Sequence, residues 1–243
     1  MKNDDHQVGR ILSRREVLTL LGGVGAAMLF GCKSEQSKQP TNPNLPCVVR
    51  PEQTEGPYFV DEMLNRSDIR SDPSNGTVKD GVPLQLTLNV YRISGDTCIP
   101  LASTIVDIWH CDALGIYSDV NDPRFSTLGQ KFLRGYQVTD KNGTVRFITI
   151  YPGWYPGRTV HIHFKVRADS KSGRNYEFTS QLYFNDSITD QVHKQLPYVK
   201  KGQRTLRNNG DGIFLNGGEQ LMLSLTKTNQ GYTTRFDIGL LIG

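Results

Sequence analysis

The strongest constraint on the fold is a series of short segments in which apolar and polar side chains alternate, separated by turns rich in Gly, Pro and Asn. Because side chains alternate between the two faces of a strand, each segment predicts a strand with a buried face. The predicted strands are residues 84–90, 105–109, 143–151, 160–166, 178–184, 221–225 and 234–238. The best helical candidate is 189–196, and the polar stretch 61–81 predicts a long surface loop. This pattern predicts an all-β fold, a β-sandwich of two mixed or antiparallel sheets with long loops and few short helices.

The N-terminal residues have the features of an export signal. Arg14 and Arg15 precede an uncharged apolar run, residues 17–31, which is shorter than the ~20 residues that span a bilayer. The arginine pair is similar to a twin-arginine signal, and the run ends in Leu-Phe-Gly-Cys32, which is similar to a lipoprotein box with Cys32 as the lipidated residue. We therefore expect a signal at 1–32, a flexible Pro-containing tether at 33–46 and one domain at 47–243. A plain N-terminal membrane anchor is the alternative.

The predicted location is the periplasm or the cell envelope of a bacterium, where the only expected membrane contact is a lipid on Cys32. Twin-arginine export carries folded proteins, which suits a metal loaded in the cytoplasm. The net charge is +4, and the Lys and Arg residues are scattered without a basic stripe. We therefore expect no nucleic-acid partner.

Three cysteines, Cys47, Cys98 and Cys111, lie beyond the predicted signal. An exported chain meets an oxidising compartment, where one pair is expected to form. Cys47 with Cys98 is the favoured pair, because both lie outside the apolar strand patterns, and Cys111 is then a candidate buried thiol. The other pairings stay open at this point.

The densest group of chemically competent side chains is Tyr155-Pro-Gly-Arg158-Thr-Val-His161-Ile-His163. In a strand, His161 and His163 share one face, so their imidazoles can bind one metal. Tyr155 and Tyr117 add two phenols. A phenol has a pKa of ~10, but a bound trivalent cation can remove its proton at neutral pH. Two phenols with two imidazoles favour ferric iron over zinc or copper.

Two other interpretations compete with this one. A copper or zinc enzyme could use the histidine pair with His110 or His193 as a third ligand. Alternatively, the chain could be a non-catalytic β-sandwich lipoprotein that binds a glycan or a protein partner through the aromatic side chains of Tyr58, Trp154 and Tyr155. Lys165 would share the histidine face of a regular strand, but a solvated charge is the expected role for it.

Five segments carry a resemblance to a known family. They are Thr54-Glu-Gly-Pro-Tyr-Phe59, the stretch from Asp107 through Tyr117, Phe132 through Gln137, Tyr151 through Phe164, and Thr179 through Phe184. The segments resemble the intradiol ring-cleavage dioxygenases, which include protocatechuate 3,4-dioxygenase and the catechol and hydroxyquinol enzymes. The resemblance covers roughly residues 47–185 and is nearest to exported single-domain relatives of the protocatechuate type.

The resemblance implies a non-haem Fe(III) site, with a small aromatic diol and O2 as substrates and a cis,cis-muconate-type diacid as product. Tyr117 and His161 would be equatorial ligands, and Tyr155 and His163 axial ligands. Tyr155 would also leave the metal and accept a proton from the substrate. The remaining implied site residues are Arg158 and Gln181 beside the bound ring, Gly56, Pro57 and Tyr58 lining the cleft, and Trp154 near its mouth. A homo-oligomer stays open.

Overall fold

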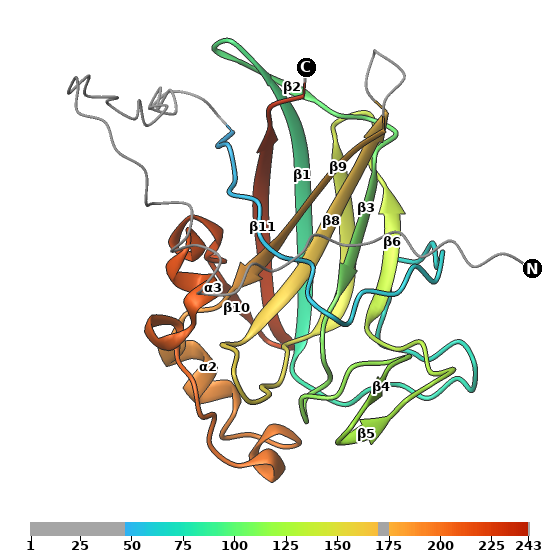
Figure 1. Cartoon of the computed structure of the whole chain (residues 1–243), viewed down its shortest axis with the longest axis vertical. Helices are drawn as coiled ribbons and strands as arrows, with labels where there is room; N and C mark the ends of the chain where they lie inside the picture. Colours follow the sequence, from blue (N-terminus) through green and yellow to red (C-terminus); the bar gives the residue numbers. More distant parts are fainter. Residues whose placement is uncertain (1–46, 170–174, 243) are drawn as a thin grey trace, which may run out of the picture. The chain divides into compact units, whose positions relative to one another are not determined.

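Two β-sheets pack against each other in the computed structural model, which describes residues 47–169 and 175–242 (Figure 1). The first sheet has the order β10-β11-β1-β2, with β7 also paired to β1. β1 runs parallel to β11 along one edge and pairs antiparallel with β7 and then β2 along the other. The bounds are β1 Pro83–Ser94, β2 Thr97–Pro100, β7 Thr144–Ile150, β10 Thr226–Thr228 and β11 Gly231–Leu240.

The second sheet has the order β6-β3-β8-β9 and is antiparallel throughout. Its strands are β3 Ile105–Trp109, β6 Arg134–Val138, β8 His161–Asp169 and β9 Asn175–Tyr183. The short strands β4 (Asn121–Asp122) and β5 (Phe125–Ser126) form a separate hairpin. The register places Trp109, His163 and Gln181 opposite one another on three neighbouring strands. One row of side chains thus crosses the second sheet.

The core forms where the alternating apolar faces of the two sheets meet. Leu84, Leu86 and Leu88 of β1 are buried, as are Ile162 and Phe164 of β8, and all belong to one apolar cluster. Burying each such side chain contributes about 1.5–3 kcal/mol. The predicted β-sandwich of two mixed or antiparallel sheets is confirmed, and six of the seven predicted strands overlap observed ones.

The strand predicted at 221–225 is wrong. Leu221 ends the 3-10 helix η3 (Gly218–Leu221), and Met222 makes only an isolated bridge to Tyr183 before β10 begins at Thr226. Leu221 and Leu223 are buried, so the apolar alternation is real. The alternation arises because the extended link from Leu221 to β10 buries alternate side chains. Its residues do not pair with a neighbouring strand as a ladder. The helix predicted at 189–196 is α2, Asp186–Val192, which starts earlier because the Asn185 side chain caps it by accepting from the Ser187 N–H.

The polar stretch 61–81 is not a simple surface loop. Ile69 is fully buried, donates its backbone N–H to Ile148 O and accepts from Leu133 N, so it links β7 to the segment before β6. The expected surface loop is confirmed for most of the stretch, which is exposed or partly exposed and contains no helix or paired strand. Its polar neighbours hide one apolar anchor, Ile69, whose backbone groups must still find partners.

The C-terminal part carries the remaining helical segments: η1 Tyr198–Lys201, η2 Asn208–Gly210 and α3 Gly212–Leu215. Cys47 and Cys98 form a disulfide and Cys111 is a buried free thiol, which confirms the favoured pairing. The predicted signal and tether, including Cys32, lie outside the described residues. Within the described part, no helix is both long and apolar enough to cross a membrane.

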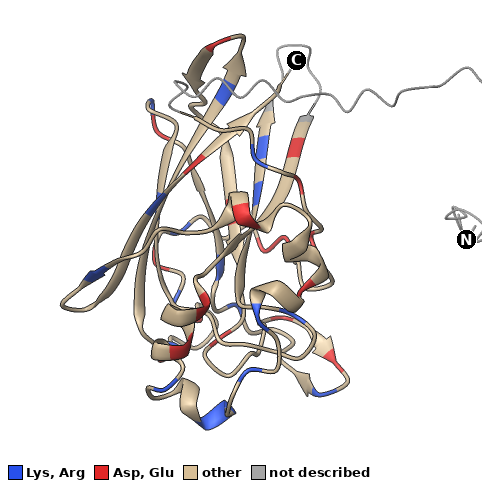
Figure 2. Ribbon diagram, turned by 90° about the vertical axis from the view of Figure 1, so that its left-hand side faces the viewer, with Lys and Arg blue, Asp and Glu red and all other residues tan. Residues whose placement is uncertain are grey.

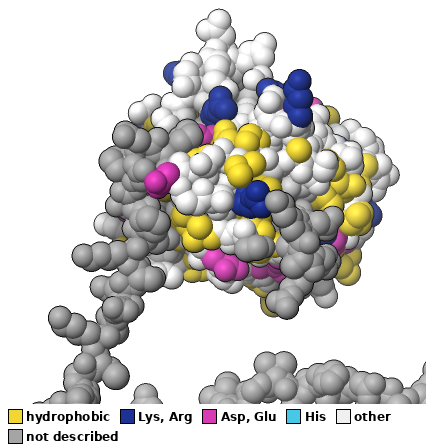
Figure 3. All heavy atoms as spheres, turned by 90° about the horizontal axis from the view of Figure 1, so that it is seen from above, with side chains coloured by type: hydrophobic (Ala, Val, Ile, Leu, Met, Phe, Trp, Pro, Cys, Tyr) yellow, Lys and Arg dark blue, Asp and Glu magenta, His cyan; other side chains and the backbone are white. Residues whose placement is uncertain are grey.

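Charged residues of both signs are spread along the ribbon, and neither sign gathers into a stripe in this view (Figure 2). On the face seen in Figure 3, hydrophobic side chains form small groups separated by charged and polar ones.

Candidate metal centre and active site

β8 places His161 and His163 side by side on the face of the second sheet that points away from the apolar core. Both imidazoles are buried, and their Nε2 atoms lie 3.0 Å apart. The carbonyl oxygen of Thr159 can only accept, so the His161 Nδ1 at 2.7 Å donates a hydrogen to it. This hydrogen bond fixes the tautomer and leaves the Nε2 lone pair of His161 free for a metal.

Tyr117 and Tyr155 reach the histidines from two different loops. The Tyr155 Oη lies 3.2 Å from His161 Nε2, and the two tyrosine rings are 5.7 Å apart. Tyr117 is 1% exposed, and its buried hydroxyl has no hydrogen-bond partner among the described residues. Such an orphaned group costs about 1–3 kcal/mol, so a native structure needs a reason to keep it. A cation bound between the phenols and imidazoles supplies that reason.

Glycines allow the two tyrosine loops to pack backbone against backbone. Gly115 has φ +79°, and a Cβ there would lie 2.1 Å from the Trp154 carbonyl oxygen. A Cβ on Gly153 would lie 2.5 Å from the Ala113 carbonyl oxygen. The Asp112 side chain turns the first loop by accepting from two backbone N–H groups within it. The close approach of Tyr117 and Tyr155 therefore follows from these small residues.

Burial controls the ionisation of the four donors. It lowers the pKa of His161 to about 3, with the nearby Arg158 charge as a further cause, and it lowers that of His163 well below the ordinary histidine value. Burial also raises the pKa of Tyr117 and of Tyr155 above that of a free phenol. All four groups are thus neutral at pH 7 without a cation. A bound multivalent metal ion would lower the pKa of the two phenols and favour their ionised form, because its charge dominates the site.

Arg158 and Gln181 lie together beside the donors, as the resemblance implies. The Arg158 Nη2 donates to Gln181 Oε1 over 2.5 Å, and the Gln181 amide donates to the Thr54 carbonyl over 2.9 Å. Gln181 is 0% exposed and pairs with His163 across β8 and β9. The register of β8 with β9 runs without a break from His161 opposite Tyr183 to Asp169 opposite Asn175.

The segment Thr54–Phe59, here called the strap, covers the histidine face (Figure 1). Gly56 has φ +72°, and a Cβ there would lie 3.4 Å from His163 Cε1. The Tyr58 ring stacks on Tyr117 with centroids 4.5 Å apart, and its hydroxyl donates to Asp122 over 2.7 Å. Gly56 and Tyr58 therefore contact the candidate ligands, whereas Pro57 is exposed.

The strap also explains the position of Lys165, for which the expectation of a solvated charge is wrong. Lys165 is 7% exposed, forms an ion pair with Glu55 and lies 4.2 Å above the Phe59 ring. The strap supplies both partners, a carboxylate and an aromatic face, and so makes burial of an ammonium tolerable. Trp154 is also buried and donates to the Gly202 carbonyl over 3.2 Å.

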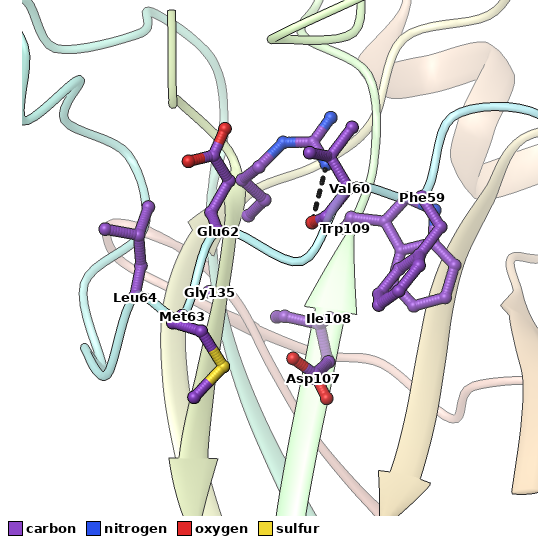
Figure 4. A pocket seen from close by; sticks show the side chains of 10 residues that line it. Phe59, Val60, Glu62, Met63, Leu64, Asp107, Ile108, Trp109 and Gly135 are labelled. Atoms are coloured by element: carbon purple, nitrogen blue, oxygen red, sulfur yellow. Dashed lines mark hydrogen bonds between the residues drawn. The ribbon is translucent and has the colours of Figure 1, made fainter. Parts of the chain in front are cut away.

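The sequence did not identify Trp109 as a residue that packs against a candidate metal donor. Trp109 stacks on His163 with centroids 4.8 Å apart and planes 6° apart. Behind it, a small cavity is lined by residues that include Phe59, Glu62, Asp107 and Trp109 (Figure 4). The four metal donors do not line this cavity, so it is not the candidate substrate site. Trp109 could have been identified from the pairing of β3 with β8, which places it opposite His163. The sequence did not predict that pairing.

A copper or zinc site with a third histidine finds no support. Both ring nitrogens of His110 are engaged, by the Cys111 carbonyl at 2.8 Å and the Thr149 hydroxyl at 2.7 Å. His193 Nε2 donates to the Pro152 carbonyl. Across residues 47–169 and 175–242, no three His, Cys, Asp or Glu side chains are grouped to hold a metal. The set of two phenols and two imidazoles is therefore the candidate centre.

Comparison with known proteins agrees with this assignment of the fold. A family model described as Dioxygenase matches residues 54–206. The chain is 32% identical over 161 residues to the protocatechuate 3,4-dioxygenase beta chain of Burkholderia cepacia, a stretch that covers 63% of this chain and 66% of that relative, just under two thirds of its length.

Solved structures are similar over a larger share of the chain. An intradiol ring-cleavage dioxygenase from Tetranychus urticae is 32% identical, with a TM-score of 0.68, and the match covers 80% of this chain and 95% of that one. The dioxygenase domain of a dioxygenase carbohydrate-binding protein fusion from Streptomyces sp. SirexAA-E is 30% identical, with a TM-score of 0.57, covering 81% of this chain and 100% of that domain.

Proposed function

This chain belongs to the intradiol ring-cleavage dioxygenase family, and on that premise we propose that it is a non-haem Fe(III) dioxygenase. The proposed substrates are a small aromatic with two adjacent hydroxyl groups and O2. The ring is cleaved between the two hydroxylated carbons, and both oxygen atoms enter a cis,cis-muconate-type diacid.

The observation that carries the proposal is the convergence of Tyr117, Tyr155, His161 and His163, with the Tyr117 hydroxyl left without a protein partner. Two phenols and two imidazoles are a donor set that suits a hard, trivalent ion, and the residues present fit ferric iron. When bound, the iron supplies Lewis-acid activation and a template for the diol. Every other contribution comes from the side chains around it.

The two tyrosines differ in burial, and this difference assigns their roles. Tyr117 is enclosed by Tyr58 and Trp109, so it is suited to remain a ligand throughout. Tyr155 is only half-buried and follows a Pro/Gly loop, so it can move away from the metal position and accept a substrate proton at its Oη. Its raised pKa in the metal-free site favours the protonated phenol after that transfer.

Arg158 and Gln181 supply preorganised polar groups beside the donors. A fixed guanidinium stabilises negative charge that develops on the aromatic ring and does not need to reorganise during the reaction. The missing side chain at Gly56 leaves room next to His163, and the Tyr58 ring offers an aromatic wall. An aromatic wall near a fixed cation suits a planar diol that binds as an anion.

The first test is the visible absorption spectrum of the purified protein, with iron measured on the same sample, before and after addition of catechol without oxygen. We expect a broad tyrosinate-to-iron band that moves to longer wavelength with catechol. His161→Ala should lose iron, and Tyr155→Phe should lose part of the colour. A colourless protein that takes up no ferric iron would reject the proposal and favour the glycan- or partner-binding interpretation, whereas a His161→Ala protein with full iron would reject the ligand assignment.

We also propose that the chain is exported to the periplasm or cell envelope, with Cys32 as a candidate lipid attachment site. The disulfide between Cys47 and Cys98 supports an oxidising compartment. Cell fractionation of wild type beside Arg14→Lys/Arg15→Lys tests export. If the double variant were located as the wild type is, the twin-arginine assignment would be wrong.

A further inference from the structure

A carboxylate outside the family match holds Arg158 in place. Asp211 lies beyond residues 54–206, 53 positions after Arg158 in the chain, and it is 1% exposed. Its Oδ2 accepts from Arg158 Nε at 2.8 Å and from the Thr159 backbone N–H at 2.8 Å. Its Oδ1 accepts from the N–H groups of Ile213 and Phe214 and so caps α3. One buried carboxylate thus ties the start of α3 to the residues that lead into β8.

The same C-terminal segment also supports Gln181, by a second route. The Gln53 side-chain amide donates to the carbonyls of Ile213 and Asn216, at 2.9 and 3.0 Å. The Tyr183 hydroxyl lies 2.7 Å from Gln53 Oε1 and 3.0 Å from Gln181 Oε1. A buried network therefore runs from the residues around α3 to both polar groups beside the metal donors, and it fixes which way the Gln181 amide faces.

One of the three nitrogen atoms of the Arg158 guanidinium has no hydrogen-bond partner among the described residues. Asp211 takes its Nε hydrogen and Gln181 takes an Nη2 hydrogen, whereas Nη1 has no protein hydrogen bond within the described part of the chain. A free arginine side chain samples many rotamers, and a carboxylate partner restricts them before the substrate arrives. Asp211 also balances the arginine charge close to the buried imidazole of His161.

We propose that Asp211 is a positioning residue for the reaction: it holds the Arg158 guanidinium so that Nη1 faces the bound diol. The inference rests on the proposed dioxygenase function and deepens it, by assigning part of the site to the segment that follows the family match. Asp211 does not contact the metal donors in this role and acts only through Arg158.

The test uses Asp211→Asn, because asparagine is also a good helix cap and keeps nearly the same shape. It removes the charge and presents at most one acceptor to the four donors that Asp211 serves. Asp190→Asn is the matched control, since Asp190 also forms ion pairs with arginine, here Arg204 and Arg207, but in the C-terminal helical region outside the site. Arg158→Lys and the Asp211→Asn/Arg158→Lys double variant complete a cycle.

For the iron-loaded full chain, we expect Asp211→Asn to keep the iron content and visible band of the wild type while catechol turnover, as kcat/KM, falls about 10- to 100-fold. In the Arg158→Lys background the same substitution should have little further effect, and Asp190→Asn should match the wild type. If the fold loss in kcat/KM of the double variant equalled the product of the losses in the two single variants, the proposal would be overturned. Such independence would mean that Asp211 affects turnover by a general structural role and not through Arg158. Loss of iron in Asp211→Asn, or wild-type kinetics in that variant, would also overturn the proposal.

A second readout does not depend on activity. In metal-free full-length protein labelled with nitrogen-15, the Arg158 Nε–H resonance, identified by its absence in Arg158→Lys, should be shifted and slow to exchange with solvent. Asp211→Asn should move it and speed its exchange, while Asp190→Asn leaves it in place. If the wild type bound no iron and cleaved no catechol, the proposed function would fail, yet this resonance would still report on the Asp211 contact. A freely exchanging Arg158 Nε–H in the wild type would refute that contact.

Discussion

The substitution Gly56→Ala tests two effects of one methyl group: its effect on the free energy of unfolding, through the backbone, and its effect on substrate binding in the proposed active site. The Gly56 φ of +72° lies in the left-handed region, where a side chain costs about 1–2 kcal/mol. Replacing Gly by Ala also restricts the unfolded chain, which returns about 0.4–1 kcal/mol. The net expected loss in the free energy of unfolding is about 1 kcal/mol, because the new Cβ, 3.4 Å from His163 Cε1, makes an ordinary contact and not a clash.

The same methyl group has a larger expected effect on the substrate. It would also lie 3.9 Å from His163 Nε2, which faces the His161 Nε2 at 3.0 Å, and so takes up space next to the proposed metal position. Overfilling a packed site costs about 1–3 kcal/mol, which corresponds to a loss of about 5- to 150-fold in affinity for catechol. Iron binding itself should survive, because no donor is removed.

The chain offers a matched control in Gly76→Ala. Gly76 has φ +73°, nearly equal to that of Gly56, but a Cβ there would meet nothing within 4 Å. Urea unfolding should therefore give both variants similar losses of stability, and an anaerobic catechol titration of the visible band should show weaker binding in Gly56→Ala alone. If Gly56→Ala bound catechol as tightly as Gly76→Ala does, the strap would not border the substrate site and this reasoning would be wrong.

Three further predictions test other parts of the structure. Metal-free Tyr117→Phe should be as stable as the wild type or about 1 kcal/mol more stable in urea unfolding, since it removes an unpartnered buried hydroxyl, yet it should lose most of its iron and visible colour. Cys47→Ser/Cys98→Ser opens a disulfide of sequence separation 51, and the chain-entropy estimate for the loss of unfolding free energy is about 4 kcal/mol; a loss below about 1 kcal/mol would contradict it. Burial alone would raise the pKa of Asp211, but the Thr159 N–H and the Arg158 charge bring it below the ordinary aspartate value. Ionised Asp211 therefore stabilises the fold above pH ~4. The difference in unfolding free energy between wild type and Asp211→Asn should be constant near pH ~6 and should shrink on acidification. A difference that grew on acidification would contradict a lowered pKa for Asp211.

Local pattern was enough to predict most of the sandwich and the histidine pair. Strict alternation identifies β1 and β8 because one face of each strand packs in the apolar core, and in β8 the same period brings His161 and His163 together on the other face. The pattern failed at 221–225, where alternate burial occurs without strand pairing. It could not predict the short hairpin of β4 and β5, whose two-residue strands carry no periodic signal.

The support for the site could not be predicted for a different reason. Asp211 sits between two glycines in a polar segment, which locally indicates only a turn. Its importance comes from a contact with Arg158 across 53 residues, and the chain topology alone brings the two together. The same holds for Lys165, whose burial depends on Glu55 and Phe59 in a strap more than a hundred positions earlier. Residue type was enough to select the candidate metal donors, but their surroundings are a tertiary property.

The strap and the disulfide are close in sequence but act on different properties of the protein. Cys47 lies just before the strap, so breaking its bond to Cys98 could be expected to loosen the site. The intervening chain is also held in other ways, however: Gly239 N donates to Val48 O over 2.9 Å, and Gln53 N donates to Thr179 O over 2.9 Å. These bonds fix the chain on both sheets between the cysteine and Gly56. The disulfide therefore limits the unfolded state while backbone pairing positions the strap. A chain that folds and binds iron before it reaches an oxidising compartment would then have its site assembled already, and later oxidation would add stability without changing the geometry around the metal.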